Sequence, residues 1–557
     1  MIPNFSRRID DAKHIRKNEW LSVWICMLSV VVPAAIESRC DAADELQNPV
    51  QQRVTTICQN LQTATVRVKS GTDMASGVIV SKSGLVLTVA HGLKPGSDTA
   101  MIVFSNGKTC EAKRIVVDEK ADVALLLMDV ESLTDGDWSI VRVPVVEDSV
   151  ADEVVLANGF PAREPEGMGA VARLGEILAV DRADVKTSCT LTSGDSGGPL
   201  VNSYGELIGL HRQIGVGVES NGHVAVTAIR ASLEKSDRWQ TLTQHTAVRP
   251  GTKLMSKDLT ASPHVAKTAS RVTVAIHGST ADGESAVRIL GTVLDDHHVA
   301  TKLSEIVPYH ALKCQFADGS TIAATLSKSN QTLDLAILKL VSPYNDGTAL
   351  NAAGSGRRKS ELFRSQLVVA STSLTNVSAV GMIGRVTYDE PAQPARFGAT
   401  IEANADRLFI TELSPNGSAV LAGLQVGDEL SRVDGNAATS LTSVGDLLTA
   451  RQPGDWISID VLRAMKQFSV RAQLQHDPGQ QFEKTEFLDG RTGRVSRRRG
   501  GFRSILQHDI ALEPDACGGP LFDIEGHLIA INIARRARES TLAISIEDVL
   551  KAAKRVE

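Results

Sequence analysis

The chain has 557 residues, more than a single hydrophobic core usually serves, so we expect about three domains. Hydrophobic residues make up 42% of it and charged residues 22%, which excludes a largely disordered chain. The 59 basic and 65 acidic residues leave a net charge of −6, which gives no general attraction to nucleic acid or to anionic membranes.

The N-terminal segment has the pattern of a secretory signal. Basic residues between positions 7 and 17 precede an apolar run from Trp20 to Ile36, and the small residues Ala42 and Ala43 follow. This order is typical of a signal peptide, here residues 1–43. Because the apolar run reaches the lower limit for crossing a bilayer, an uncleaved membrane anchor is the alternative. We therefore expect a secreted or periplasmic protein, membrane-anchored if the signal is not removed.

The remaining cysteines are few and odd in number: Cys58, Cys110, Cys189, Cys314 and Cys517. Such a set is not a disulfide scaffold, although one bridge between Cys58 and Cys110 stays open. No pair of His and Cys residues has the spacing of a metal site. We expect neither a metal nor a cofactor.

Three residues of the first half follow one another in an order that indicates nucleophilic catalysis. His91 lies in "LTVAHG", Asp122 in "KADVALL" and Ser196 in "GDSGGPL". A serine hydroxyl is a poor nucleophile until a neighbouring base removes its proton, and His91 would be that base. Asp122 would hold the imidazole in the correct tautomer. His, Asp and then Ser is the chain order of the chymotrypsin-type fold.

Three blocks of the first half recur in the second half in the same order: Ser76–Leu93 in Leu290–Ile306, Val103–Met128 in Gln315–Leu340, and Gly194–Leu200 in Asp515–Leu521. Both copies show short stretches of alternating apolar residues, with turn residues about every ten positions, which is typical of β barrels or sandwiches. The clearest amphipathic helices are predicted near Arg230–Lys235 and at Ser545–Lys554. The sequence therefore predicts a mainly β protein that contains one fold twice.

The second copy contains an interval that the first copy lacks. "RFGATIE" at Arg396–Glu402, "AGLQVGDELSRVDG" at Ala422–Gly435 and "SLTSVGDLLTA" further on resemble the loop, the Gly-Asp turn and the groove helix of a PDZ domain. The resemblance implies that Phe397, Gly398 and Ala399 hold the carboxylate of a C-terminal peptide, which would add as a strand.

From residue 52 onward the chain resembles the HtrA (Deg) family of trypsin-like serine proteases. The resemblance implies two tandem chymotrypsin-like double β-barrel domains, with the PDZ-like domain inserted in the second. The expected divisions are a signal peptide at 1–43, an active protease domain at 52–240, a linker at 241–265, a pseudoprotease domain at 266–396 and 477–557, and the PDZ-like domain at 397–476.

The oxyanion hole and the specificity pocket are assigned on the same resemblance. The N–H groups of Gly194 and Ser196 would bind the oxyanion. Leu191 and Ile214 match pocket positions, and their apolar side chains favour a small aliphatic residue before the cleaved bond. His211 stands where the family usually has another residue, and it resembles the histidine of glutamyl endopeptidases. A pocket for acidic side chains is therefore the alternative.

The second copy keeps Asp334 but has lost the other two catalytic functions. The histidine position falls on Ser304, or on Leu303 if the alignment shifts by one residue, and the serine position is Cys517. A thiol needs a histidine or another cation nearby to become a thiolate. The alternative is a cysteine protease with a relocated base, for which the candidates are His297, His298, His310 and His508. Asp515 replaces the oxyanion-hole glycine, which further favours an inactive copy.

Two polar clusters remain. "DDHH" at Asp295–His298 falls on a turn, where a solvated hairpin is favoured over a metal site. The arginine-rich stretch Arg491–Arg503 is predicted to be a solvated activation-type loop, with contact to an acidic partner as the alternative.

These patterns predict a secreted HtrA-like serine endopeptidase that cleaves unfolded or damaged proteins through an acyl-enzyme. Its expected partners are unfolded or peptide substrates and C-terminal peptides at the PDZ-like domain, not nucleic acid. Relatives often form trimers, but no motif decides the oligomeric state here. A non-catalytic peptide-binding adaptor or chaperone is the alternative function, and the intact set of His91, Asp122 and Ser196 argues against it.

Overall fold

The strands of each copy close into two barrels. The computed structural model describes residues 48–554, with gaps at 134–137, 146–147, 165–166, 216, 218–219, 241–248, 250, 280–285, 308, 345–357, 376–378 and 477–493. The predicted signal peptide and most of the predicted linker before residue 251 lie outside the described residues. Arg53–Glu557 form one compact unit. No described helix is long and apolar enough to cross a bilayer.

The first copy contains two closed six-stranded barrels. Its first barrel has the order β1-β2-β3-β6-β5-β4, with β1 (Thr65–Ser70), β2 (Asp73–Ile79), β3 (Leu85–Thr88), β4 (Thr99–Val103), β5 (Thr109–Asp118) and β6 (Val123–Met128). The second has the order β10-β11-β12-β9-β8-β7, with β7 (Val154–Gly159), β8 (Val171–Val180), β9 (Asp184–Thr187), β10 (Pro199–Asn202), β11 (Leu207–Gln213) and β12 (Asn221–Ala225).

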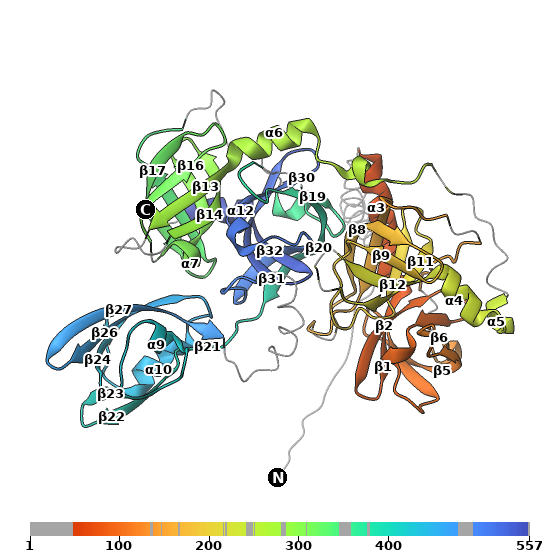
Figure 1. Cartoon of the computed structure of the whole chain (residues 1–557), viewed down its shortest axis with the longest axis horizontal. Coiled ribbons are helices and arrows are strands. Elements are labelled where there is room, and N and C mark those ends of the chain that lie inside the picture. The colour runs from red at the N-terminus through yellow and green to blue at the C-terminus, as the bar shows by residue number, and fades with distance from the viewer. Residues whose placement is uncertain are drawn as a thin grey trace, which may run out of the picture. The chain divides into compact units, whose positions relative to one another are not determined.

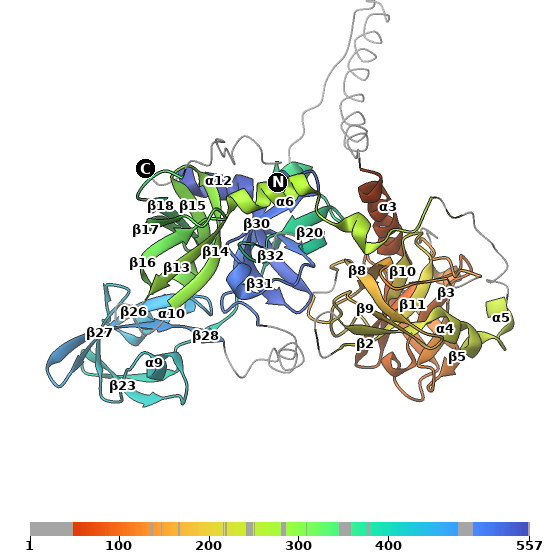
Figure 2. The same cartoon turned by 45° about the horizontal axis from the view of Figure 1, so that its top comes forward.

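The second copy repeats both barrels strand for strand (Figure 2). Its first barrel has β13 (Thr273–Ser279), β14 (Ala286–Asp295), β15 (His298–Lys302), β16 (His310–Gln315), β17 (Thr321–Asn330) and β18 (Leu335–Leu340), in the order β13-β14-β15-β18-β17-β16. Its second has β19 (Leu367–Ala370), β20 (Ala379–Glu390), β29 (Phe502–His508), β30 (Pro520–Asp523), β31 (Leu528–Ala537) and β32 (Ser540–Ser545), in the order β19-β20-β29-β32-β31-β30.

The PDZ domain is inserted between β20 and β29 (Figure 1). Its sheet runs β22-β23-β24-β26-β27, with β22 (Ala399–Asn404), β23 (Arg407–Leu413), β24 (Glu429–Val433), β26 (Trp456–Arg463) and β27 (Lys466–Gln473), and the short β25 (Asn436–Ala437) pairs with β24. Helices α9 (Ser418–Leu421) and α10 (Leu441–Thr449) pack against this sheet. The strands β21 (Ala395–Arg396) and β28 (Gln475–His476) pair where the chain enters and leaves the domain.

The insertion point has a simple counterpart in the first copy. There β8 and β9 are joined by a tight turn in which Asp181 Oδ1 accepts the backbone N–H of Ala183 at 2.8 Å. Hairpin tips carry few contacts, so they tolerate insertion of a folded domain better than strands do. The PDZ domain therefore interrupts the second copy without breaking either barrel.

Apolar side chains at alternate positions fill each barrel, because successive residues of a strand face opposite sides of the sheet. In the first barrel the core includes Val66, Val68, Ile79, Ile102 and Leu126, all fully buried. The prediction of a mainly β fold with paired barrels and an inserted PDZ domain is confirmed.

Helices connect and flank these barrels: α3 (Pro49–Ala64), α4 (Val226–Leu233), α5 (Asp237–Gln240), α6 (Pro263–Val272), α7 (Leu303–Ile306) and α12 (Ile546–Lys554), with 3₁₀ turns η1 (Ala90–Gly92), η2 (Val130–Ser132), η3 (Ser256–Leu259), η4 (Lys359–Glu361) and η5 (Pro514–Ala516). The two helices predicted from sequence correspond to α4, which begins four residues earlier than expected, and α12. All five described cysteines are buried and free, so the bridge between Cys58 and Cys110 left open by the sequence is not formed.

Candidate active site

His91 and Asp122 form a paired unit at the end of β3. His91 lies in η1, and its Nδ1 is 2.8 Å from Asp122 Oδ2, while its backbone N–H donates to Asp122 Oδ1 at 2.9 Å. Asp122 adopts the left-handed conformation (φ 58°), which a short polar side chain tolerates better than most. With Nδ1–H donating to the carboxylate, the lone pair of His91 Nε2 is available as a base.

The loop that carries Ser196 contacts β2 and the end of β3, the strand that leads to His91. Ser76 of β2 donates its N–H to the Ser196 carbonyl at 2.8 Å, and its hydroxyl donates to the Gly194 carbonyl at 2.8 Å. A Cβ on Gly197 would lie 2.3 Å from Thr88 Oγ1, so glycine alone allows this close approach. Since Thr88 ends β3, three residues before His91, the serine loop touches the segment that presents the histidine.

No hydrogen bond joins the Ser196 hydroxyl to His91 within the described residues, a bond that often tightens only when substrate binds. The Ser196 side chain is partly exposed, and 49% of the His91 side chain is exposed to solvent. Both groups can therefore be reached by a substrate.

The predicted donors of the oxyanion hole are the backbone N–H groups of Gly194 and Ser196. The Ser193 carbonyl accepts the N–H of Ala162 at 2.7 Å. In a trans peptide the N–H points opposite to the C=O, so this bond directs the Gly194 N–H away from Ala162. Within the described residues, the N–H groups of Gly194 and Ser196 have no acceptor. They are available to bind a negative oxygen.

A buried ion pair anchors the same loop. Arg173 Nη1 of β8 lies 2.8 Å from Asp195 Oδ2, and both side chains are at most 1% exposed. Asp195 Oδ2 also accepts the Thr192 N–H at 2.8 Å. Burial raises the pKa of Asp195 to about 6, and the charge of Arg173 opposes this rise. The role of Arg173 could not be predicted from the sequence, because only the fold places it against Asp195.

The predicted pocket residues fall into two environments. Leu191 is buried in the core of the second barrel, and Ile214 packs on that core, so both contribute apolar surface. His211 is fully buried, with Nδ1 3.0 Å from His223 Nδ1 and Nε2 3.2 Å from the Asn158 carbonyl. Both ring nitrogens of His211 are therefore engaged within the protein.

The histidine pair is also uncharged. His223 Nε2 lies 2.7 Å from the Thr187 hydroxyl, so the chain of hydrogen bonds continues beyond the pair. Burial, and then the neighbouring His223, holds the pKa of His211 well below its usual range. A neutral imidazole without a free N–H offers no cation for an acidic substrate side chain. This geometry favours the aliphatic pocket over the glutamyl alternative.

The pairing with Asp122 gives a testable pH dependence. The hydrogen bond that His91 donates to Asp122 raises the pKa of His91, although burial and Arg212 oppose the rise. Since His91 must be neutral to act as a base, we expect kcat/KM to fall on the acid side with an apparent pKa above 6.5. A pH profile with an uncharged peptide substrate measures this limb. An apparent pKa below 6.5 on the acid side of the profile would contradict the pairing.

The same pairing predicts that Asp122→Asn lowers kcat by about 10⁴-fold.

The second copy builds the same frame around different side chains. Asp334 is again left-handed (φ 54°), and its carboxylate accepts the Ser304 N–H at 2.7 Å and the Ser304 hydroxyl at 2.8 Å. These bonds match those of Asp122 with His91, so Ser304 and not Leu303 stands at the histidine position. A hydroxyl cannot serve there as a base near neutral pH.

No histidine pairs with Cys517 among the described residues, and the charge of Lys302 lowers the pKa of its thiol less than burial raises it. Cys517 is fully buried, its Sγ is 3.8 Å from the Ser496 hydroxyl, and burial raises its pKa. His508 Nε2 donates to Asn532 Oδ1 (2.8 Å), and burial lowers the pKa of His508 to about 4. His297 and His298 lie at the turn between β14 and β15, where His298 pairs with Asp295 at 2.9 Å.

The described part of the arginine-rich stretch covers this second site. Ser496 donates its N–H to the Arg535 carbonyl at 2.9 Å, and Lys302 donates to the Arg498 carbonyl at 3.0 Å. Arg498 pairs with Asp455 of the PDZ domain at 2.6 Å. Arg498 is 3% and Arg499 6% exposed, so the prediction of a solvated loop is wrong for these residues. Their partners lie far away in the sequence and bury them.

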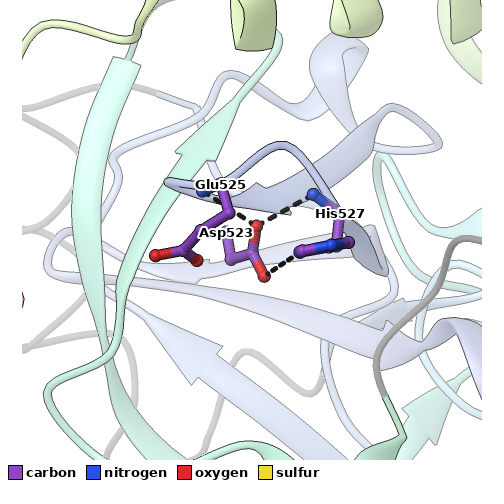
Figure 3. A group of neighbouring side chains, drawn as sticks. All are labelled: Asp523, Glu525 and His527. Atoms are coloured by element: carbon purple, nitrogen blue, oxygen red, sulfur yellow. Dashed lines mark hydrogen bonds and ion pairs between the residues drawn. The ribbon is translucent and has the colours of Figure 1, made fainter. Parts of the chain in front are cut away.

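A group that could hold a cation, formed by Asp523, Glu525 and His527, lies in the turn between β30 and β31 (Figure 3). Asp523 Oδ1 accepts the N–H groups of Glu525 and His527, and Oδ2 pairs with His527 Nδ1 at 2.9 Å. Asn202 accepts two N–H groups in the matching turn of the first copy. The carboxylate therefore serves as a turn cap, as the amide does in the first copy.

The PDZ loop presents unpaired backbone donors next to an open strand edge. Within the described residues, the N–H groups of Phe397 and Gly398 have no acceptor, and Gly398 is left-handed (φ 77°). Phe397 is 6% exposed and belongs to the core of the domain. The strand β22 is the outer strand of its sheet and packs near α10. This arrangement suits strand addition by a peptide.

Comparison with known proteins gives two domain matches and several relatives. A trypsin-like peptidase domain matches residues 75–210, and a PDZ domain matches residues 395–474. A "Probable periplasmic serine endoprotease DegP-like" of Pseudomonas fulva is 23% identical over 406 residues, which are 71% of this chain and 78% of the relative. The protein of the same name in Halomonas elongata is 32% identical over 152 residues, 25% of this chain and 29% of the relative.

Two further similarities complete the comparison. "Serine endoprotease DegS" of Haemophilus influenzae is 29% identical over 142 residues, 25% of this chain and 41% of the relative. The chain thus spans less than half of the Halomonas and Haemophilus relatives that it matches. The serine endoprotease from Yersinia pestis is a solved structure with 17% identity and a TM-score of 0.29, covering 76% of this chain and 98% of that chain.

Proposed function

We propose that this HtrA/Deg-like serine protease cleaves unfolded or damaged polypeptides with His91, Asp122 and Ser196 as its catalytic residues. Its peptidase and PDZ domains and its DegP-like relatives support the proposal. The observation that carries the proposal is the pairing of His91 Nδ1 with Asp122 beside the loop of Ser196. It leaves Nε2 as the free nitrogen of a half-exposed imidazole, in a segment that the Ser196 loop contacts through Thr88.

The proposed reaction passes through an acyl-enzyme. Ser196 Oγ attacks the carbonyl carbon of the scissile bond while His91 Nε2 accepts the hydroxyl proton. The oxyanion would be held by the N–H groups of Gly194 and Ser196. The intermediate collapses as His91 gives its proton to the leaving amine. A water molecule then gives a proton to His91 and attacks the ester carbonyl, and His91 returns the proton to Ser196 Oγ as the carboxylic acid product is released. Asp122 stabilises the imidazolium throughout.

The second copy is proposed to be a pseudoprotease that takes no part in this chemistry. The support comes from Ser304 in place of a base and from Cys517, which is fully buried beneath the segment that contains Ser496. We propose residues 52–240 as the catalytic domain, 266–396 with 477–557 as the inactive one and 397–476 as the PDZ-like domain.

The location is proposed to be the periplasm or the exterior of the cell. The basic and apolar pattern of residues 1–43 supports export, and the relatives from Halomonas and Pseudomonas carry the word periplasmic in their names. Unfolded client proteins would be the substrates there.

Hydrolysis of unfolded casein tests the proposal. We expect the purified protein to cleave it, and a serine-directed fluorophosphonate to stop the cleavage. Absence of both cleavage and labelling would overturn the proposal and favour the peptide-binding adaptor. In that case binding of unfolded chains without hydrolysis should remain measurable.

The PDZ-like domain is proposed to bind peptides through their C-terminal carboxylate at Phe397, Gly398 and Ala399. Amidation of a bound peptide should weaken its affinity by about 10-fold or more, because the charge and its hydrogen bonds are lost. Fluorescence anisotropy with free and amidated peptides measures the difference. Arg396→Gln should weaken binding of the free acid, whereas Arg407→Gln, on an arginine at the far end of β22's partner strand, should not. Equal affinity for both peptides would contradict the assignment.

A further inference from the structure

Arginines of the second copy contact two loops of the first copy that flank Ser196. The first loop is the turn that begins at Pro161. Glu164 at its end is 4% exposed, and its two carboxylate oxygens accept from Arg385 at 2.6 Å and from Arg536 at 2.8 Å. Burial acts to raise the pKa of Glu164, but the two arginines hold this pKa below its usual value.

This turn sets the orientation of the oxyanion-hole peptide. Glu164 donates its N–H to the Pro161 carbonyl at 3.1 Å and so closes the turn around Ala162. Ala162 in turn donates to the Ser193 carbonyl and thereby directs the Gly194 N–H. Arg385 and Arg536 are therefore connected to the oxyanion hole through one side chain and one turn.

The second loop joins β11 to β12 and borders the specificity pocket. Arg538 is 1% exposed, and its Nη2 donates to the Gly217 carbonyl at 2.7 Å and to Asn221 Oδ1 at 2.9 Å. The Asn221 side chain also accepts the Gly215 N–H and donates to the Cys189 carbonyl at 2.8 Å. Arg538 therefore fixes an amide that links this loop to Cys189, two residues from Leu191.

The contacts of Arg538 come from the turn between β31 and β32, which corresponds to the β11–β12 loop of the first copy. In the first copy, β11 ends at Gln213 and an irregular loop follows, whereas β31 continues to Ala537 and pairs directly with β32 at Ser540. The hairpin tip is therefore Arg538–Glu539, both at most 1% exposed. The second copy has replaced its own pocket loop with a hairpin buried against the first copy.

Charge balance argues that this contact is permanent. Glu539 lies 3.7 Å from Arg163 of the first copy, and Arg536 pairs with Glu390 at 2.7 Å as well as with Glu164. Separating the copies would leave several of these charges without a partner, and an uncompensated buried charge is strongly unfavourable.

We propose that the second copy is a positioning domain, in which Arg536 and Arg538 of the β31–β32 hairpin hold the oxyanion and pocket loops of the first copy ready for catalysis. This inference rests on the proposed serine protease function. It gives the degenerate copy a reason to be retained, because its hairpin acts on the active site through Glu164 and Asn221.

Steady-state kinetics with a small peptide substrate test the contacts of Arg536 and Arg538 separately. Arg538→Met should raise KM on the order of 10-fold with a smaller change in kcat, because the pocket wall loosens. Arg536→Met should lower kcat by about 10²-fold, as expected when an oxyanion donor is misplaced. Arg536→Met should lower kcat less in a Glu164→Gln background than in the wild type, because the proposed connection from Arg536 to the oxyanion hole passes through the Glu164 carboxylate.

Arg498→Met is the matched control. Arg498 is as buried as Arg538, but its ion pair is with Asp455 of the PDZ domain, so kcat and KM should stay near those of the wild type. Melting temperatures separate loss of folding from loss of positioning. If folded Arg536→Met and Arg538→Met retain kcat/KM within twofold of the wild type, or lose no more than Arg498→Met, the inference is wrong.

Hydrogen exchange provides a readout that does not need activity. Arg538→Met should speed amide exchange in peptides that contain Cys189 and Asn221, and Arg498→Met should leave them unchanged. An inert wild-type protein would overturn the proposed function, while the exchange data would still decide whether the hairpin holds these loops. Unchanged exchange in Arg538→Met would refute the positioning role.

Discussion

Ser196→Ala is expected to abolish peptide-bond hydrolysis, lowering kcat by at least about 10⁴-fold. The substitution removes the nucleophile but leaves the loop intact, because Ser196 is held by its carbonyl, which accepts from Ser76. The variant should therefore fold and should still bind unfolded casein. Hydrolysis of labelled casein, with the melting temperature as a check on folding, measures the effect.

Cys517→Ala is the matched substitution in the second copy. Its side chain is fully buried, and burial raises the pKa of its thiol and so disfavours the thiolate that would attack. We expect its kcat/KM to equal that of the wild type. If Cys517→Ala were inactive and Ser196→Ala active, the roles of the two copies would be reversed.

Arg173→Met is expected to have the largest effect on stability, a loss of about 3–5 kcal/mol in the free energy of unfolding. The variant keeps the volume but leaves the carboxylate of Asp195, which is 0% exposed, without its counter-charge. Chemical denaturation at pH 8 measures the loss. A change below about 1 kcal/mol would contradict the assignment of this pair as the anchor of the loop.

The pH dependence of this loss follows from the same pair. The pKa of Asp195 is raised to about 6 in the folded protein, above its value near 3.8 in the unfolded chain. A raised folded-state pKa contributes stability at low pH that is lost as pH rises through that value. Without the charge of Arg173, the pKa of Asp195 in the folded protein is raised further. Because Asp195 is then protonated over more of the pH range, the variant should be less destabilised at pH 5 than at pH 8. Arg173→Met/Asp195→Asn should recover part of the stability at pH 8, because no charge is then buried.

The fold could be predicted because its signals are local and repeated. Alternating apolar residues, such as those around Val66 and Val68, indicate strands, and the three recurring blocks indicate two copies of one fold. The PDZ domain was recognisable from the Gly-Asp turn at Gly427 and the loop at Gly398. The insertion replaces a three-residue hairpin turn, which corresponds to residues 181–183 of the first copy.

The triad could also be predicted, since each member lies in a short motif with a fixed order. The supporting residues could not. Arg173, His223 and Asn221 lie in ordinary strand sequences. The closed barrel brings Arg173 and His223 against Asp195 and His211, and packing of the second copy brings Arg538 against Asn221. Arginines at 498 and 499 were expected in solvent because charge runs usually are, and distant partners bury them instead.

The identity of the residue that attacks the substrate tests the account most directly. The wild-type protein would be treated with a fluorophosphonate, and the labelled peptide identified by mass spectrometry. We expect one label, on Ser196, that is lost in Ser196→Ala and kept in Cys517→Ala. A label on Cys517, or active hydrolysis in a protein whose Ser196 remains unlabelled, would contradict it.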